Sequence, residues 1–303
     1  MPDIQELVRQ VRARTRTTGD TDATTDNDLV GWLWDEMKDV SALIKKKAPR
    51  YFNETIQIAW PANVQERRMP ERVGIVTDVM LVDAAQAPAV VRLLVPIEYQ
   101  DMVRFGGNFR YVRDPMAYGM WYQRERNTLG VIPSSGAQTI QVNYDRTLPE
   151  PSYGTPAVPY AAGTLVLAVT PTVGRTRLED GYYEGAFVEI ISGTGAGQVG
   201  QVSAFDSVTR TCTMTENWAV TPDATSVYGI RVEIPEDYHG GLVDGAVSRF
   251  YEMEQEFRAA SHHRGRALDN YQRVIETMFP IQRQDPHQIR KMSLRRGPWQ
   301  TIS

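Results

Sequence analysis

An apolar stripe near the end of the chain is the feature that most constrains the fold. From Val243 to Met278, eleven positions spaced alternately three and four apart carry apolar or aromatic residues at every place except Arg264. This spacing puts the stripe on one face of an α-helix. One helix over the whole span would be about 50 Å long at 1.5 Å per residue. The sequence therefore predicts a long helix, with a kink or break at Gly265, that packs on another element or another subunit.

Two further helices are predicted near the start, over 4–14 and 27–47, because each carries its own apolar stripe. Asp26 is expected to cap the second helix, since a carboxylate can accept from the free N–H groups of a first turn. Three lysines in the last turn suit the negative end of that helix, and Pro49 is expected to end it.

Between residues 51 and 151 the pattern changes to short β-like runs separated by Pro and Gly. Residues 54–60 and 138–144 alternate with period two, and 74–82 and 90–95 are further strand candidates. A helical turn is expected over 96–102. This part of the chain is predicted to form a small antiparallel sheet.

The composition changes again from residue 156 to 231, where Gly, Thr, Val and Tyr dominate and lysine is rare. About 75 residues suffice for a small β-sandwich or barrel. We therefore predict an α+β protein in which an all-β domain (156–231) is inserted into a discontinuous helical domain formed by 1–155 and 232–303. Strands are expected in the insert over 165–169, 186–191, 198–205 and 211–215, and the alternating stretch 230–234 is expected to lead out of it.

Charge is distributed unevenly along the 303 residues, which carry a net charge of −4. Residues 281–303 hold five basic side chains and one acid, so this tail carries +4 and the rest of the chain −8. An acidic body disfavours a protein that wraps nucleic acid through phosphate contacts. The single cysteine, Cys212, excludes an intrachain disulfide and a multi-cysteine zinc site. The sequence shows no secretory signal and no membrane-spanning run, so we expect no membrane partner.

The run from Gly195 to Gly200 matches the glycine pattern of dinucleotide-binding loops. That motif requires a helix directly after it, whose N-terminal N–H groups hold the pyrophosphate. Strand-like residues lie on both sides here, so a glycine-rich hairpin turn is the better interpretation. We predict no bound cofactor.

No group of residues favours catalysis or metal binding. His262 and His263 are adjacent and diverge by about 100° on a helix, so they cannot share one metal ion. Glu179, Asp180 and Glu184 surround a predicted turn, where acids are ordinary surface residues. Cys212 lies in a strand-like run without a flanking catalytic signature and is expected to be structural. The chain is therefore not expected to be an enzyme.

The basic tail is the strongest candidate for a binding segment. Apolar residues are interspersed with its cations, which favours docking to a partner protein over a solvated tail or a contact with nucleic acid. The residues predicted to dock are Arg290, Lys291, Arg295, Arg296 and Trp299.

Three stretches, taken in order, resemble one protein family. The first is the helix start at 28–34 that leads to 51–55, and the second is 121–133 followed by 140–144. The third is 234–242, a proline-acid-tyrosine entry into the last helix. In this order they resemble the head-to-tail adaptor (connector) proteins of tailed bacteriophages, including those related to tail tubular protein A. The segment 156–231 departs from that pattern.

The resemblance implies a homo-oligomeric ring, usually dodecameric, beneath the portal protein of the virion and assembled in the host cytoplasm. It implies that the basic tail inserts into the portal, that tail or nozzle proteins bind on the other side, and that packaged DNA passes through the lumen without specific binding. The acidic body suits such a conduit, because like charge keeps DNA from the wall. The stripe residues expected between subunits are Phe250, Met253, Phe257, Tyr271, Val274 and Met278.

A second function from another class stays open at this stage. In this alternative the chain is a tail-associated protein that binds host surfaces or glycans, with the inserted β domain as the binding module.

Overall fold

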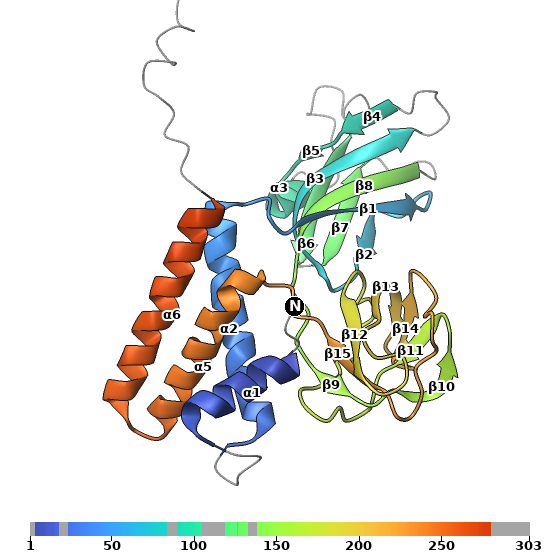
Figure 1. Ribbon diagram of the computed structural model, residues 1–303. Helices are drawn as coiled ribbons and strands as arrows, with labels where there is room; N and C mark the ends of the chain where they lie inside the picture. The colour runs from blue at the N-terminus through green and yellow to red at the C-terminus, as the bar shows by residue number, and fades with distance from the viewer. Residues whose placement is uncertain are drawn as a thin grey trace, which may run out of the picture.

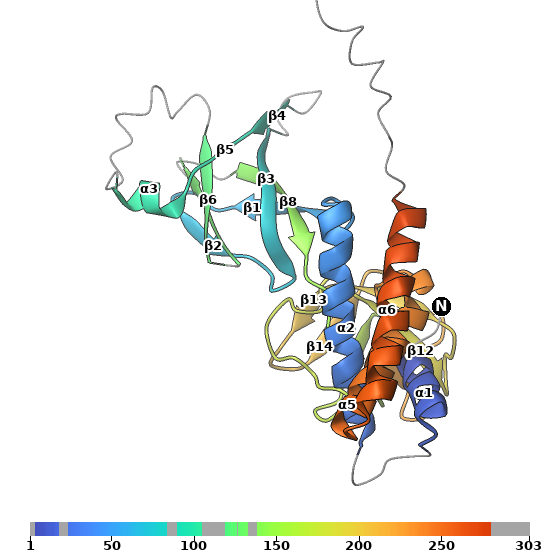
Figure 2. The same ribbon diagram turned by 90° about the vertical axis from the view of Figure 1, so that its left-hand side faces the viewer.

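The computed structural model describes residues 4–17, 24–83, 90–104, 119–125, 127–132 and 138–279. They form helices and mainly antiparallel sheets, so the predicted α+β class is confirmed. Three buried apolar clusters define a helical unit, a first β unit within residues 53–146 and a second β unit within residues 153–230. The helical unit lies to the left of the two β units in Figure 1, and Figure 2 shows α2 and α6 running alongside each other.

Both ends of the described chain contribute to the helical unit. One apolar core combines Leu7, Leu33, Val243 and Ile275, all of them buried. The unit is therefore discontinuous in sequence, because both β units lie between its second and third long helices. Its helices are α1 (Ile4–Thr15), α2 (Asp26–Lys47), the short 3₁₀ helix η2 (Glu236–Tyr238), α5 (His239–Met253) and α6 (Phe257–Met278).

Thr25, and not the predicted Asp26, caps α2. The Thr25 hydroxyl accepts from the Asp28 N–H at 3.2 Å, while the Asp28 carboxylate accepts from the Thr25 N–H at 2.9 Å. This reciprocal pair is a capping box, and it satisfies backbone donors that the first helical turn leaves free. The Asp26 carboxylate accepts instead from Arg12 Nε at 2.7 Å, which joins α2 to α1.

The single long helix predicted over 243–278 is wrong. The chain turns at 254–256, and α5 and α6 pack against each other as a helical hairpin. Gln255 takes a φ of 62°, and the Glu256 N–H donates to the Tyr251 carbonyl at 2.8 Å, as in a Schellman motif. Gly265 lies within the continuous α6, so it marks no break.

The first β unit contains two four-stranded sheets that share one core. The predicted strands 54–60, 74–82 and 138–144 are confirmed, while 90–95 divides into two strands at the buried Leu94. The helix α3 (Tyr99–Arg104) covers part of the predicted turn. One sheet has the order β1 (Asn53–Trp60), β8 (Gln138–Arg146), β3 (Val73–Asp83), β4 (Val90–Leu93), and the other β2 (Glu66–Arg68), β7 (Thr128–Ile132), β6 (Met120–Glu125), β5 (Val95–Pro96).

The second β unit is one seven-stranded antiparallel sheet with its own core. The strands predicted over 186–191, 198–205 and 211–215 are confirmed, while only the first part of the one predicted over 165–169 is strand. The strand expected over 230–234 is wrong, because β15 ends at Ile230 and the Glu233 side chain joins the ion-pair cluster described below. The order is β10 (Ala157–Ala161), β11 (Thr164–Val166), β14 (Thr211–Met214), β13 (Val199–Asp206), β12 (Phe187–Ser192), β15 (Val227–Ile230), β9 (Tyr153–Gly154).

Candidate functional site

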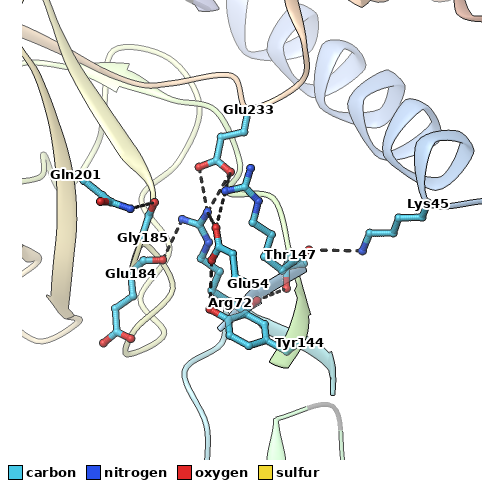
Figure 3. Close-up of polar contacts among 10 residues, drawn as sticks. Lys45, Glu54, Arg72, Tyr144, Thr147, Glu184, Gly185, Gln201 and Glu233 are labelled. Carbon is cyan, nitrogen blue, oxygen red and sulfur yellow. Dashed lines mark hydrogen bonds and ion pairs between the residues drawn. The ribbon is translucent and has the colours of Figure 1, made fainter. Parts of the chain in front are cut away.

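An ion-pair cluster joins the three units at the place where they meet (Figure 3). Its centre is Arg72, whose side chain is 1% exposed. Arg72 Nη1 donates to the Glu184 carbonyl of the second β unit at 2.9 Å, and Nη2 donates to the Glu233 carboxylate, next to η2, at 3.1 Å. Glu54 on β1 lies 3.6 Å from the same nitrogen. One buried side chain therefore holds together the two β units and the segment that leads into α5.

Arg146 completes the cluster. Its Nη1 lies 2.7 Å from the Glu54 carboxylate and 3.1 Å from that of Glu233, so two cations face two anions. Burial raises the pKa of Glu233, while Arg72 and Arg146 oppose that rise by favouring the carboxylate. Lys45 Nζ on α2 lies 3.5 Å from the Arg146 carbonyl and connects the cluster to the helical unit. No sequence pattern pointed to this cluster, because its members are far apart in the chain.

A second buried carboxylate holds the helical hairpin on α2. Glu36 is fully buried and accepts from Arg249 Nε at 3.1 Å, from Arg264 Nη1 at 2.7 Å and from the Tyr271 hydroxyl at 3.1 Å. Burial and the nearby Glu36 raise the pKa of Tyr271. A Cβ added at Gly245 would lie within 2.5 Å of the Glu36 side chain, so a glycine is needed there. Arg264 thus departs from the apolar stripe because it pairs with Glu36.

Asp244 connects α5 to the helices on either side. Its carboxylate lies 2.7 Å from Arg14 Nη1 on α1, 3.0 Å from His263 Nδ1 and 3.4 Å from Arg266 Nη2 on α6. His263 also stacks on Tyr251, with ring centroids 5.6 Å apart. These contacts hold the hairpin in place. His263 takes part in both the ion pair and the ring contact, whereas His262 is exposed.

The last described residues lie at a basic end of the helical unit. The Phe279 ring packs on the Tyr51 ring, with centroids 5.6 Å apart, so α6 ends beside the chain segment that follows α2. Lys46, Lys47 and Arg50 are exposed in this region. The predicted docking residues Arg290, Lys291, Arg295, Arg296 and Trp299 lie outside the described residues, in the chain that continues from this basic end.

The residues predicted to lie between subunits divide into two groups. Phe250, Tyr271 and Val274 are buried within the chain and belong to its own packing, and Met278 packs partly against the same core. Met253 and Phe257 are 43% and 67% exposed. They flank the turn between α5 and α6, and we call residues 252–258, all of them exposed, the hairpin tip.

A cavity of about 380 Å³ lies between α2 and the two β units, and we call it the inter-unit cleft. Trp34, Leu148 and Tyr182 give its lining an apolar part. Cations outnumber anions in the rest of the lining, which includes Lys38, Lys45, Arg146, Arg177, Glu71 and Glu179.

The glycine pattern at 195–200 lies in the hairpin between β12 and β13, which confirms the predicted turn. Gly193, Gly195 and Gly197 all have positive φ values near 80°, a conformation that glycine permits without strain. No helix follows the pattern to hold a pyrophosphate, because residues 199–206 form a strand.

Cys212 is fully buried in the second β unit, and burial raises the pKa of its thiol. A buried, protonated thiol is a poor nucleophile, in keeping with the structural role expected of it. Hydrogen bonding by Ser207 lowers the pKa of Asp180, first through its side chain and then through its N–H, which donates at 3.0 Å. Burial raises the pKa of the Glu184 side chain. The backbone carbonyl of the same residue accepts the hydrogen bond from Arg72.

Within the described ranges, no three His, Cys, Asp or Glu side chains gather in a way that would hold a metal ion. None of the helices in those ranges combines the length and apolarity that crossing a bilayer demands. Neither a protein-family model nor a curated protein matches this sequence.

Proposed function

We propose that this chain is a structural, non-enzymatic protein of a tailed-bacteriophage virion, which forms a ring that joins the portal to the tail and helps to retain packaged DNA. In this proposal the helical unit and the first β unit form the adaptor, and the second β unit is the inserted module. The portal lies at the basic end of the helical unit, and tail or nozzle proteins bind elsewhere on the ring.

The observation that carries the proposal is the place where the chain leaves the helical unit. Phe279 lies against Tyr51 in the region of exposed Lys46, Lys47 and Arg50, so this end of the helical unit is basic, and the sequence that follows it, residues 281–303, carries a further +4. A charged, apolar-containing segment on a rigid base suits insertion into a groove of a larger partner. The −8 carried by residues 1–280 would keep DNA from adhering to the lumen of a ring.

The buried ion pairs support the same role. In a closed ring each subunit must contact both neighbours at a set angle, so the three units within one chain must keep a fixed orientation relative to one another. The Arg72 cluster joins both β units to the entry of α5, and Glu36 holds the hairpin on α2. These contacts join the three units and support the fixed orientation that an adaptor needs.

Truncation after Pro280 tests the proposal directly. Residues 4–279 form the three described apolar cores, so we expect the shortened protein to fold, which thermal unfolding beside the full chain will check. We expect it to lose binding to portal rings isolated from tailless heads, as measured by co-sedimentation. A variant with Arg290, Lys291, Arg295 and Arg296 changed to Gln, compared with Trp299→Ala, separates the charge contribution from the apolar one.

Equal binding of portal rings by the truncated and full-length proteins would refute the role of the tail. Retention of a glycan on an array, lost when residues 156–231 are deleted, would favour the host-surface alternative instead.

A further inference from the structure

We infer that neighbouring copies of this chain join through the hairpin tip of one copy and the inter-unit cleft of the next. The inference rests on the proposed ring and names the two surfaces that would build it. Each surface is defined by described residues, and the two differ in charge and in position.

The hairpin tip combines exposed apolar side chains with negative charge. Phe257 and Met253 are 67% and 43% exposed, although the positions beside them in the stripe are buried. Glu252, Glu254 and Glu256 are exposed around them, and with the exposed Arg258 they leave the tip a net charge of −2. Large apolar side chains surrounded by charge are typical of a protein contact.

The inter-unit cleft is complementary to this tip. Its apolar lining can receive an aromatic or thioether side chain, and its four cations and two acids leave a net charge of +2. Lys38 is held loosely within the chain. It is 54% exposed and its partner Asp35 is 40% exposed, so their pair contributes little to stability and the Lys38 ammonium group can take a further carboxylate. Lys45 is more enclosed, because it lies 3.8 Å from the mostly buried Asp145 and donates to the Arg146 carbonyl.

The geometry makes the contact one between two copies. The tip lies at the end of the helical unit away from the first β unit (Figure 1), whereas the cleft lies between α2 and the two β units. The contacts of Glu36 and Asp244 hold the hairpin in place, so a tip does not reach the cleft of its own chain. Two different surfaces that pair between copies form a heterologous interface, which closes into a ring when the rotation fits.

Cysteine cross-linking tests this pairing, because the one native thiol is buried and should stay unreactive. We expect an equal mixture of Glu254→Cys and Lys38→Cys proteins to form a disulfide-linked dimer when treated with the thiol oxidant diamide. Each protein alone should give none, because a heterologous contact brings a tip cysteine only to a cleft position. A mixture of Glu254→Cys with Val208→Cys is the control, since Val208 is 84% exposed and outside both surfaces.

Sedimentation velocity provides the second measurement. We expect the full-length chain to self-associate as its concentration rises, and Phe257→Ser to weaken that association about tenfold or more. Because Phe257 is mostly exposed, this variant should fold normally. A Phe257→Ser protein and a Lys38→Glu protein, each impaired alone, should form a dimer when mixed, through the one intact interface.

Cross-linking no stronger than in the control mixture, or self-association unchanged by Phe257→Ser, would overturn the inference. Tail-dependent binding to portal rings could still hold in that case, and the proposed function would stand with other subunit contacts. Failure of the full-length chain to bind portal rings, with tip-dependent association intact, would instead refute the function alone.

Discussion

Arg72→Ala is expected to lower the free energy of unfolding by about 3–5 kcal/mol, the largest effect of any single substitution considered for this chain. The change leaves the Glu233 carboxylate, 4% exposed, with only Arg146 as a partner. It also removes the hydrogen bond to the Glu184 carbonyl, the contact of this side chain with the second β unit. Urea unfolding followed by circular dichroism measures the loss, and limited proteolysis of the 147–152 connection reports whether the two β units separate.

Arg68→Ala is the matched control for this prediction. Arg68 pairs with Glu71 in the same part of the chain, but its side chain is 72% exposed. Water can replace that contact, so the unfolding midpoint should not change measurably. If the two variants unfold alike, the Arg72 cluster does not hold the units together.

Glu36→Ala is expected to cost about 3 kcal/mol, because it removes the carboxylate that Arg249, Arg264 and Tyr271 share. Both arginines are about one-third exposed and can be partly rehydrated, which keeps the loss at the lower end for a buried pair. Since the hairpin depends on this contact, hydrogen exchange in α5 and α6 should rise more than in either β unit.

Asp39→Asn on the same helix is the control for Glu36. Asp39 is 54% exposed and lies 3.7 Å from Arg264, so its loss should change stability much less. Equal destabilisation by the two substitutions would mean that charge near Arg264, rather than the buried carboxylate, stabilises the hairpin.

The two ends of the helical hairpin differ in a way that matters for assembly. Lys46, Lys47 and Arg50 surround the end where the tail begins, and the tip at the other end is acidic. The 22 residues of α6 separate these ends by about 33 Å at 1.5 Å per residue. The helical unit therefore has a basic end, formed by the end of α2 and the residues after it, and an acidic end at the hairpin tip, which suits a protein that binds two different partners.

Sequence periodicity predicted the elements well wherever one face of an element packs on a core. In α2 the stripe from Leu29 to Ile44 is buried throughout, and the period-two alternation of Ile140 and Val142 matches a buried face of β8. Local spacing contains this information because burial itself sets the period.

The turn at 254–256 was missed because its chemical signal is atypical. The left-handed position that ends α5 holds Gln255, whereas Gly or Asn usually occupies it. The apolar stripe also continues across the turn through Met253 and Phe257, so periodicity favours an unbroken helix. Gly265 suggested a break, but α6 continues through it.

The ion-pair clusters were beyond prediction from local patterns. Arg72 and Glu233 are 161 residues apart, and Glu36 and Arg264 are 228 apart. Only the tertiary fold brings such partners together, and many alternative pairings of the same charges fit the sequence equally well. Arg264 was the one visible sign, because a charge within an apolar stripe needs a buried partner.

Electron cryomicroscopy of intact virions, with this protein carrying a gold-labelled tag, tests the central claim most directly. The account predicts label in a ring at the single vertex where head meets tail, directly below the portal. Label spread over the capsid faces, confined to the distal tail, or missing from purified particles would contradict it.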